Sequence, residues 1–101
     1  MRIGIIGGTG LDELSIGTKL QRQTVSTRYG KTDLMTGSVD NKDVVFCARH
    51  GHKHSIAPHR INYKSNIAAL KKSGCSSILA TAACGSLKPE YQEGNILILD
   101  Q

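Results

Sequence analysis

Short apolar runs separated by turn residues predict a chain composed mainly of β-strands. Glycine and asparagine stand between the runs, most clearly at Tyr29-Gly30-Lys31 and at Asn41. The expected strands are 3–6, 24–28, 34–39, 44–48 and 77–81, with a further strand beginning at 96. The run at 44–48 is apolar throughout, which is typical of a strand buried on both faces.

One helix is expected after Pro58. Tyr63, Ile67 and Leu70 recur at positions i, i+4 and i+7, which predicts an amphipathic helix. Lys71 and Lys72 would occupy its last turn, and Gly74 follows where a left-handed residue would end it. A single helix cannot cover both faces of a sheet of buried strands, so the chain is expected to be an incomplete part of one domain.

The composition narrows the possible partners. The chain has 101 residues, a formal net charge of +5 and only four aromatic residues. The basic residues are scattered and lack interleaved aromatics, so a small anionic ligand fits better than nucleic acid. The three cysteines have no metal-type spacing and indicate a reduced, cytoplasmic protein. No apolar stretch is long enough for a signal peptide or a membrane span.

The first candidate site is the glycine-rich segment 4–10. Its glycines would let the backbone N–H groups approach an anion, and Thr9 adds a hydroxyl donor. The same spacing resembles a dinucleotide-binding loop, but that motif requires a helix directly afterwards and a second parallel strand. The sequence of residues 11–18 favours a helix only poorly, and a hairpin pattern follows it. We favour a phosphate loop, with an NAD(P)-binding loop and a simple tight turn as alternatives.

The second candidate is a cluster that contains all four histidines, at positions 50, 52, 54 and 59. Alternating histidines on an extended segment could hold a metal ion. Arg49 and Lys53 lie among them, however, and would repel a cation while attracting phosphate. We therefore favour an anion site in which Arg49 offers its planar fork and His50 a ring N–H. Solvated surface histidines are the remaining alternative.

The third candidate follows the strand at 77–81. Small residues at 81–86 continue from the carboxyl end of that strand, where open α/β sheets bind ligands. The backbone N–H groups there could close a third side of an anion pocket, although close packing of a strand end would explain the same residues. Cys84 is a poor candidate nucleophile because no activating group is evident.

Together, the three segments resemble the methylthioadenosine phosphorylase branch of the trimeric purine nucleoside phosphorylases. The motifs that carry the resemblance are IGIIGGTGL, RHGHKHSIAPHRINYKSNIAALK, TAACGSL and EGNILILDQ. The resemblance implies an α/β fold in which residues 1–101 form the amino-terminal part of one nucleoside phosphorylase domain. That domain would be a mixed β-sheet flanked by helices, incomplete in this chain.

The resemblance also implies a site and a reaction. Thr9, Arg49, His50, Ala82 and Ala83 would bind inorganic phosphate, the co-substrate, and no metal or other cofactor is expected. The reaction would be purine nucleoside phosphorolysis in a homotrimer, with 5′-methylthioadenosine favoured as substrate over a 6-oxopurine nucleoside. Groups that read the base and the ribose would lie beyond Gln101, so the chain alone is expected to be inactive. An inactive paralogue that joins a longer subunit is a further alternative.

The chain departs from the family pattern at one of these positions. Ala82 stands where family members commonly carry threonine, so a side-chain hydroxyl is missing while the backbone N–H remains. A hydrogen bond to a charged ligand contributes about 1.5–3 kcal/mol. We therefore expect weakened, but not abolished, phosphate binding.

Overall fold

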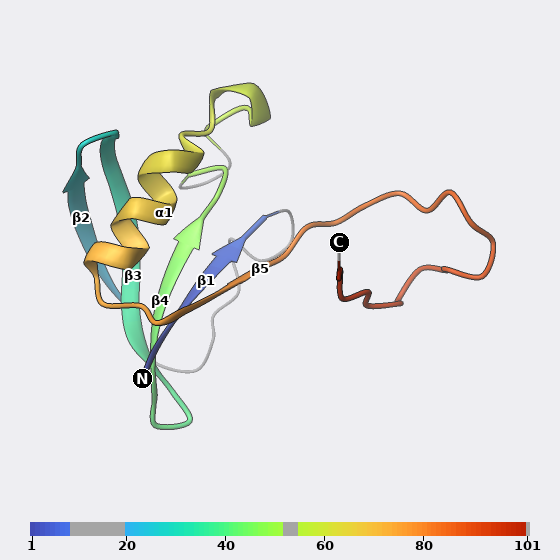
Figure 1. Cartoon of the computed structure of the whole chain (residues 1–101), viewed down its shortest axis with the longest axis horizontal. Helices are drawn as coiled ribbons and strands as arrows, with labels where there is room; N and C mark the ends of the chain where they lie inside the picture. Colours follow the sequence, from blue (N-terminus) through green and yellow to red (C-terminus); the bar gives the residue numbers. More distant parts are fainter. Residues whose placement is uncertain (9–19, 52–54, 101) are drawn as a thin grey trace.

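One mixed sheet with a helix on one face forms the body of the protein (Figure 1). The computed structural model describes residues 1–8, 20–51 and 55–100. Five strands lie in the order β2-β3-β4-β1-β5. The elements are β1 (Arg2–Gly7), β2 (Gln21–Thr27), β3 (Gly30–Val39), β4 (Lys42–Ala48), the 3₁₀-helix η2 (Pro58–Arg60), α1 (Tyr63–Lys72) and β5 (Ser77–Ala80). The predicted mixed α/β architecture is confirmed.

Two tight turns connect the antiparallel half of the sheet. Gly30 begins β3 at a φ of 129°, and Asp40 and Asn41 connect β3 to β4 with φ of 48° and 63°. Asparagine and aspartate tolerate this left-handed conformation better than most residues. The predicted hairpin is thus confirmed. β2 is an edge strand antiparallel to β3, whereas a dinucleotide-binding unit requires its second strand parallel to the first.

Helix α1 begins and ends at the residues that its sequence favours. The side chain of Asn62 caps the amino end by accepting a hydrogen bond from the backbone N–H of Ser65 at 3.1 Å. At the other end Gly74 adopts a φ of 87°, and its N–H donates to the carbonyl of Lys71 at 3.0 Å. The predicted helix and its glycine stop are both confirmed.

The predicted apolar face of α1 was only partly right. Leu70 is fully buried, but Tyr63 and Ile67 remain 57% and 48% exposed. The face that packs on the sheet instead includes Ser65 and Ala69. Their small side chains allow a close approach, and the buried Ser65 hydroxyl lies 2.6 Å from that of Thr32 on β3. A satisfied hydroxyl can be buried at little cost, so polarity did not mark the inner face.

The core lies between α1 and the centre of the sheet. In β4 every residue from Val44 to Cys47 is buried, which confirms the prediction of a strand covered on both faces. The core cluster consists of Ile6, Val25, Leu34, Val45, Cys47, Ala69 and Leu70, with Cys75 packed against it. Packing between these side chains holds β1 beside β4. The carboxyl ends of the two strands therefore lie next to each other.

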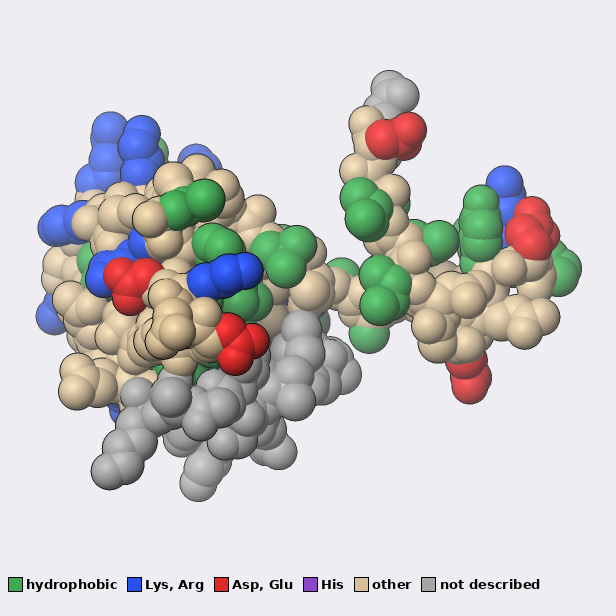
Figure 2. Space-filling model, turned by 90° about the horizontal axis from the view of Figure 1, so that it is seen from below, with side chains coloured by type: hydrophobic (Ala, Val, Ile, Leu, Met, Phe, Trp, Pro, Cys, Tyr) green, Lys and Arg blue, Asp and Glu red, His purple; other side chains and the backbone are tan. Residues whose placement is uncertain are grey.

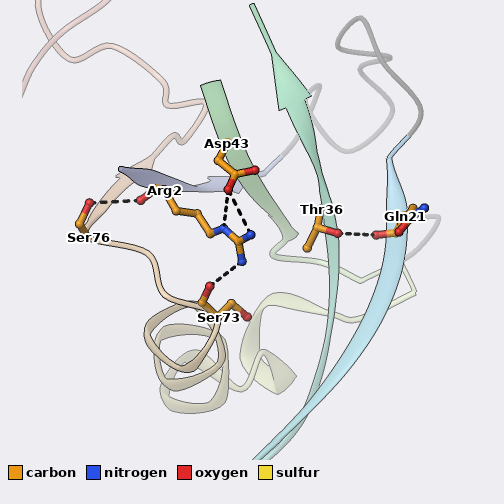
Figure 3. Close-up of polar contacts among 6 residues, drawn as sticks. All are labelled: Arg2, Gln21, Thr36, Asp43, Ser73 and Ser76. Atoms are coloured by element: carbon orange, nitrogen blue, oxygen red, sulfur yellow. Dashed lines mark hydrogen bonds and ion pairs between the residues drawn. The ribbon is translucent and has the colours of Figure 1, made fainter. Parts of the chain in front are cut away.

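A clamp at the amino end of β1 reinforces this arrangement (Figure 3). Nε and Nη2 of Arg2 donate to Oδ2 of Asp43 on β4 at 3.3 and 3.2 Å. Nη1 donates to the carbonyl of Ser73 at the end of α1, at 2.8 Å. One side chain thus connects β1, β4 and the helix, and the backbone N–H of Ser76 donates to the Arg2 carbonyl at 2.9 Å.

Residues 81–100 run away from the sheet without helix or strand (Figure 1). The strand expected from position 96 is therefore wrong for the described residues. A strand requires a hydrogen-bonding partner, and apolar residues alone do not supply one. The segment instead exposes large apolar side chains: Leu87, Ile96, Leu97, Ile98 and Leu99. Figure 2 shows hydrophobic side chains on this projecting part of the chain. In the part of the chain that the structure covers, no helix has the length and apolarity to span a membrane.

Candidate functional site

The three candidate segments follow three parallel strands that lie side by side. β1 is parallel to both β4 and β5, and the register pairs Gly7 with Ala48 and Ile6 with Ala80. The carboxyl ends of all three strands therefore meet at one edge of the sheet. Hydrogen bonds continue past the strand ends: the backbone N–H of Arg49 donates to the Gly7 carbonyl at 2.8 Å, and that of Thr81 to the Ile6 carbonyl at 3.0 Å.

Arg49 connects the three segments at this edge. Its side chain is half-buried, and Nη1 donates to the carbonyl of Thr81 at 3.0 Å. The guanidinium lies directly against the buried backbone of Gly8. The two ion pairs between described residues join Arg2 to Asp43 and Arg22 to Asp33. Arg49 is in neither of them. Its positive charge is therefore not neutralised by a described carboxylate, as a site for an anion requires.

His50 is held beside Arg49 by a short loop. Its side chain is buried, and Nδ1 lies 3.3 Å from the carbonyl of Ile56. A carbonyl can only accept, so this contact places a proton on Nδ1 and fixes the orientation of the ring. The loop is closed by the backbone N–H of Ile56, which donates to the His50 carbonyl at 2.8 Å, and by Gly51 at a φ of 76°.

The remaining predicted residues have different outcomes. Ala82 and Ala83 directly follow Thr81, whose carbonyl accepts the hydrogen bond from Arg49. Both alanines are exposed. No described group pairs with their backbone N–H groups. Thr9 lies outside the described residues, as do His52 and His54, which the metal alternative requires. His59 is exposed within η2.

Comparison with known proteins identifies the family. The sequence model of the phosphorylase superfamily matches residues 2–101. The chain belongs to the phosphorylase superfamily. Among curated relatives, S-methyl-5′-thioadenosine phosphorylase from Danio rerio is 47% identical over all of this chain. The 6-oxopurine nucleoside phosphorylase from Pyrococcus furiosus is 46% identical over 99% of it.

Solved structures give the same result for the fold. Methylthioadenosine phosphorylase from Schistosoma mansoni in complex with adenine superposes with a TM-score of 0.82 and 43% identity, over 88% of this chain and 33% of that one. The nucleoside phosphorylase-like fold is thus confirmed for this part of the molecule. The phosphorylase-superfamily chain spans 37% of the length of each of the two curated relatives.

Two contacts at the candidate site of this phosphorylase-superfamily chain were not predicted from the sequence. The sequence placed Gly8 in a loop whose glycines approach an anion and Thr81 in a segment that offers backbone N–H groups, but it did not predict that either residue contacts Arg49. Both act through the backbone: Gly8 by lacking a side chain where the guanidinium lies, and Thr81 through its carbonyl. The available signal was the glycine pair Gly7-Gly8, because only a residue without a side chain permits such an approach.

The cysteines differ in their surroundings. Burial raises the pKa of the Cys47 thiol to about 11, so at neutral pH it is protonated and a poor nucleophile. Burial also raises the pKa of Cys75, against the opposing charge of Arg2. Cys84 is exposed, and its Sγ contacts the Ala82 carbonyl at 3.9 Å. No described group beside Cys84 provides a base or a cation that would activate it.

Proposed function

We propose that the complete gene product cleaves a purine nucleoside with inorganic phosphate, and that residues 1–101 supply its phosphate site. The observation that carries the proposal is the position of Arg49. Its guanidinium lies at the shared carboxyl edge of β4, β1 and β5, between the Gly8 backbone and the Thr81 carbonyl, without a described carboxylate partner. A planar fork of this kind matches the oxygen atoms of phosphate.

In this reaction a phosphate oxygen forms a bond to C1′ of the nucleoside while the bond from C1′ to the purine nitrogen breaks. The electron pair of the broken bond leaves with the purine. Arg49, His50, Thr9 and the backbone at Ala82 and Ala83 would hold the phosphate beneath the ribose, where it meets the positive charge that develops on the sugar. Correct placement of a nucleophile can lower a barrier by about 7–11 kcal/mol, and no cofactor beyond phosphate is required.

The proposed substrate is 5′-methylthioadenosine, which would yield adenine and 5-methylthioribose 1-phosphate. Relatives with similar identity are named for methylthioadenosine and for 6-oxopurine nucleosides, so inosine is the competing substrate. The test measures base release by the complete gene product with each nucleoside, with and without phosphate. We expect phosphate-dependent adenine release with a higher kcat/KM than for hypoxanthine release. The reverse preference would assign the 6-oxopurine class, and no phosphate-dependent release from either would contradict the proposal.

The proposal extends to the setting of the enzyme. We propose that it is a cytoplasmic homotrimer that acts in purine and methionine salvage. Size-exclusion chromatography with light scattering of the complete gene product tests the trimer, because a monomer of the same activity would remove that part of the proposal.

Position 82 offers a gain-of-affinity prediction. Ala82→Thr would add a hydroxyl one residue after Thr81, whose carbonyl accepts a hydrogen bond from Arg49. One added hydrogen bond to a charged ligand contributes about 1.5–3 kcal/mol, so the phosphate KM should fall by about tenfold or more. Ala82→Val is the matched control, because valine has the same shape without the hydroxyl. An equal change in both variants would show that the hydroxyl is not the cause.

A further inference from the structure

Gly8 lies where any side chain would collide with Arg49. A Cβ placed on Gly8 would come within 2.1 Å of Arg49 Nη2 and 2.8 Å of its Cζ. Both distances are far below a normal contact between non-bonded atoms. The obstructed atoms belong to the end of a long side chain rather than to a rigid backbone. A side chain at position 8 would therefore displace the guanidinium more readily than it would unfold the strand.

The other side of the guanidinium is held by the Thr81 carbonyl, to which Nη1 donates at 3.0 Å. Gly8 follows β1 and Thr81 follows β5, which are neighbouring strands. The guanidinium of Arg49, which follows β4, thus lies between the backbones at these two strand ends. We propose that Gly8 is a positioning residue for phosphate binding: its missing side chain seats the Arg49 guanidinium against the backbone, with its fork oriented toward the anion. This inference rests on the proposed phosphate site.

Gly4, within the strand that Gly8 follows, provides a comparison with a different cause. A Cβ there would meet the side chains of Leu70 at 3.2 Å and Cys75 at 3.3 Å. These are apolar core contacts on the α1 face, away from the strand end. Gly4→Ala should therefore lower stability through crowding of the core while leaving the phosphate KM unchanged. It is the matched control for the glycine-to-alanine change at Gly8, directly after β1.

The experiment is a double-mutant cycle in the complete gene product. The phosphate KM and the nucleoside KM are measured for the wild type, Gly8→Ala, Arg49→Ala and the double variant, with Gly4→Ala as control. We expect Gly8→Ala to raise the phosphate KM about tenfold or more, the range of one lost charged hydrogen bond, with little change in the nucleoside KM. In the Arg49→Ala background, Gly8→Ala should add no further increase, because its target is gone.

The outcomes separate this inference from the proposed function. If Arg49→Ala leaves the phosphate KM unchanged, the phosphate site itself is wrong. If Arg49→Ala raises it but Gly8→Ala does not, or if the two effects multiply, only the positioning role of Gly8 is overturned. An equal rise for Gly4→Ala would also overturn it, as a general effect of strand crowding.

A folding defect in Gly8→Ala would still be informative. The double variant removes the atoms that the new Cβ meets, so its Tm should exceed that of Gly8→Ala alone. If both variants are equally destabilised, the crowding at position 8 does not involve Arg49, and the inference fails.

Discussion

Replacing Arg49 with alanine in the complete gene product should raise the phosphate KM by about tenfold to a hundredfold. The guanidinium provides hydrogen bonds to a charged ligand, and each such bond contributes about 1.5–3 kcal/mol. The side chain also carries a positive charge that no described carboxylate neutralises. The nucleoside KM should change much less, because Arg49 is assigned to phosphate alone. Initial rates over a phosphate series at saturating nucleoside give the values.

A matched loss of charge separates a local contact from the general attraction of a basic protein. Lys42 is exposed at the first residue of β4, at the opposite end of the strand that Arg49 follows. Lys42→Ala removes the same charge from a chain with a net charge of +5 but removes no contact at the site edge. We expect its phosphate KM to stay near that of the wild type. Equal changes in the two variants would remove Arg49 from the site.

Much of the fold could be predicted because the signals are local. The turn at Asp40 and Asn41, the helix stop at Gly74 and the apolar run 44–48 within β4 each depend on residues adjacent in sequence. The face of α1 could not be predicted in this way. Ser65 is buried because Thr32 lies opposite to it, and that partner is 33 positions away in sequence. Apolar spacing alone therefore identified the helix but misplaced Tyr63 and Ile67.

The segment at 96–99 illustrates the same limit. Its four aliphatic residues have strong strand propensity, yet the described backbone there pairs with no other strand. A strand forms only where a neighbouring strand accepts and donates its backbone hydrogen bonds. The apolar pattern at 96–99 does not show whether such a neighbour exists. By contrast, β5 forms from the equally short run at 77–80 because β1 lies beside it.

The segments of the candidate site could be predicted from the sequence, but the backbone contacts that join them could not. Arg49 and His50 have side chains whose chemistry indicates an anion, and the structure brings their segment beside those of Gly8 and Thr81. The contributions of Gly8 and the Thr81 carbonyl depend on three strands meeting at one edge. The sequence does not give the distances from Arg49 to Gly8 and to the Thr81 carbonyl, on which these contributions depend. Carbonyl groups and loop glycines are too common to mark a contact by themselves.

The largest expected effect is the loss of all activity in a protein that consists of residues 1–101 alone. The candidate phosphate site lies at one edge of the sheet, and the described residues beyond it provide no enclosing wall: residues 81–100 run outward with exposed aliphatic side chains (Figure 2). Phosphorolysis requires that the nucleoside be held over the phosphate with water excluded. The related phosphorylases use chains nearly three times as long, of which this segment matches 37%.

The measurement is adenine release from 5′-methylthioadenosine by purified residues 1–101, at equal molar concentration to the complete gene product. We expect no phosphate-dependent release above the rate in buffer, while the complete gene product turns over. Circular dichroism and light scattering show whether the short protein is folded and unaggregated, since exposed Ile96 and Leu99 favour association. Phosphate-dependent adenine release by a folded short protein would mean that residues 1–101 also hold the nucleoside. The base and ribose contacts would then have to be found at the sheet edge around Arg49.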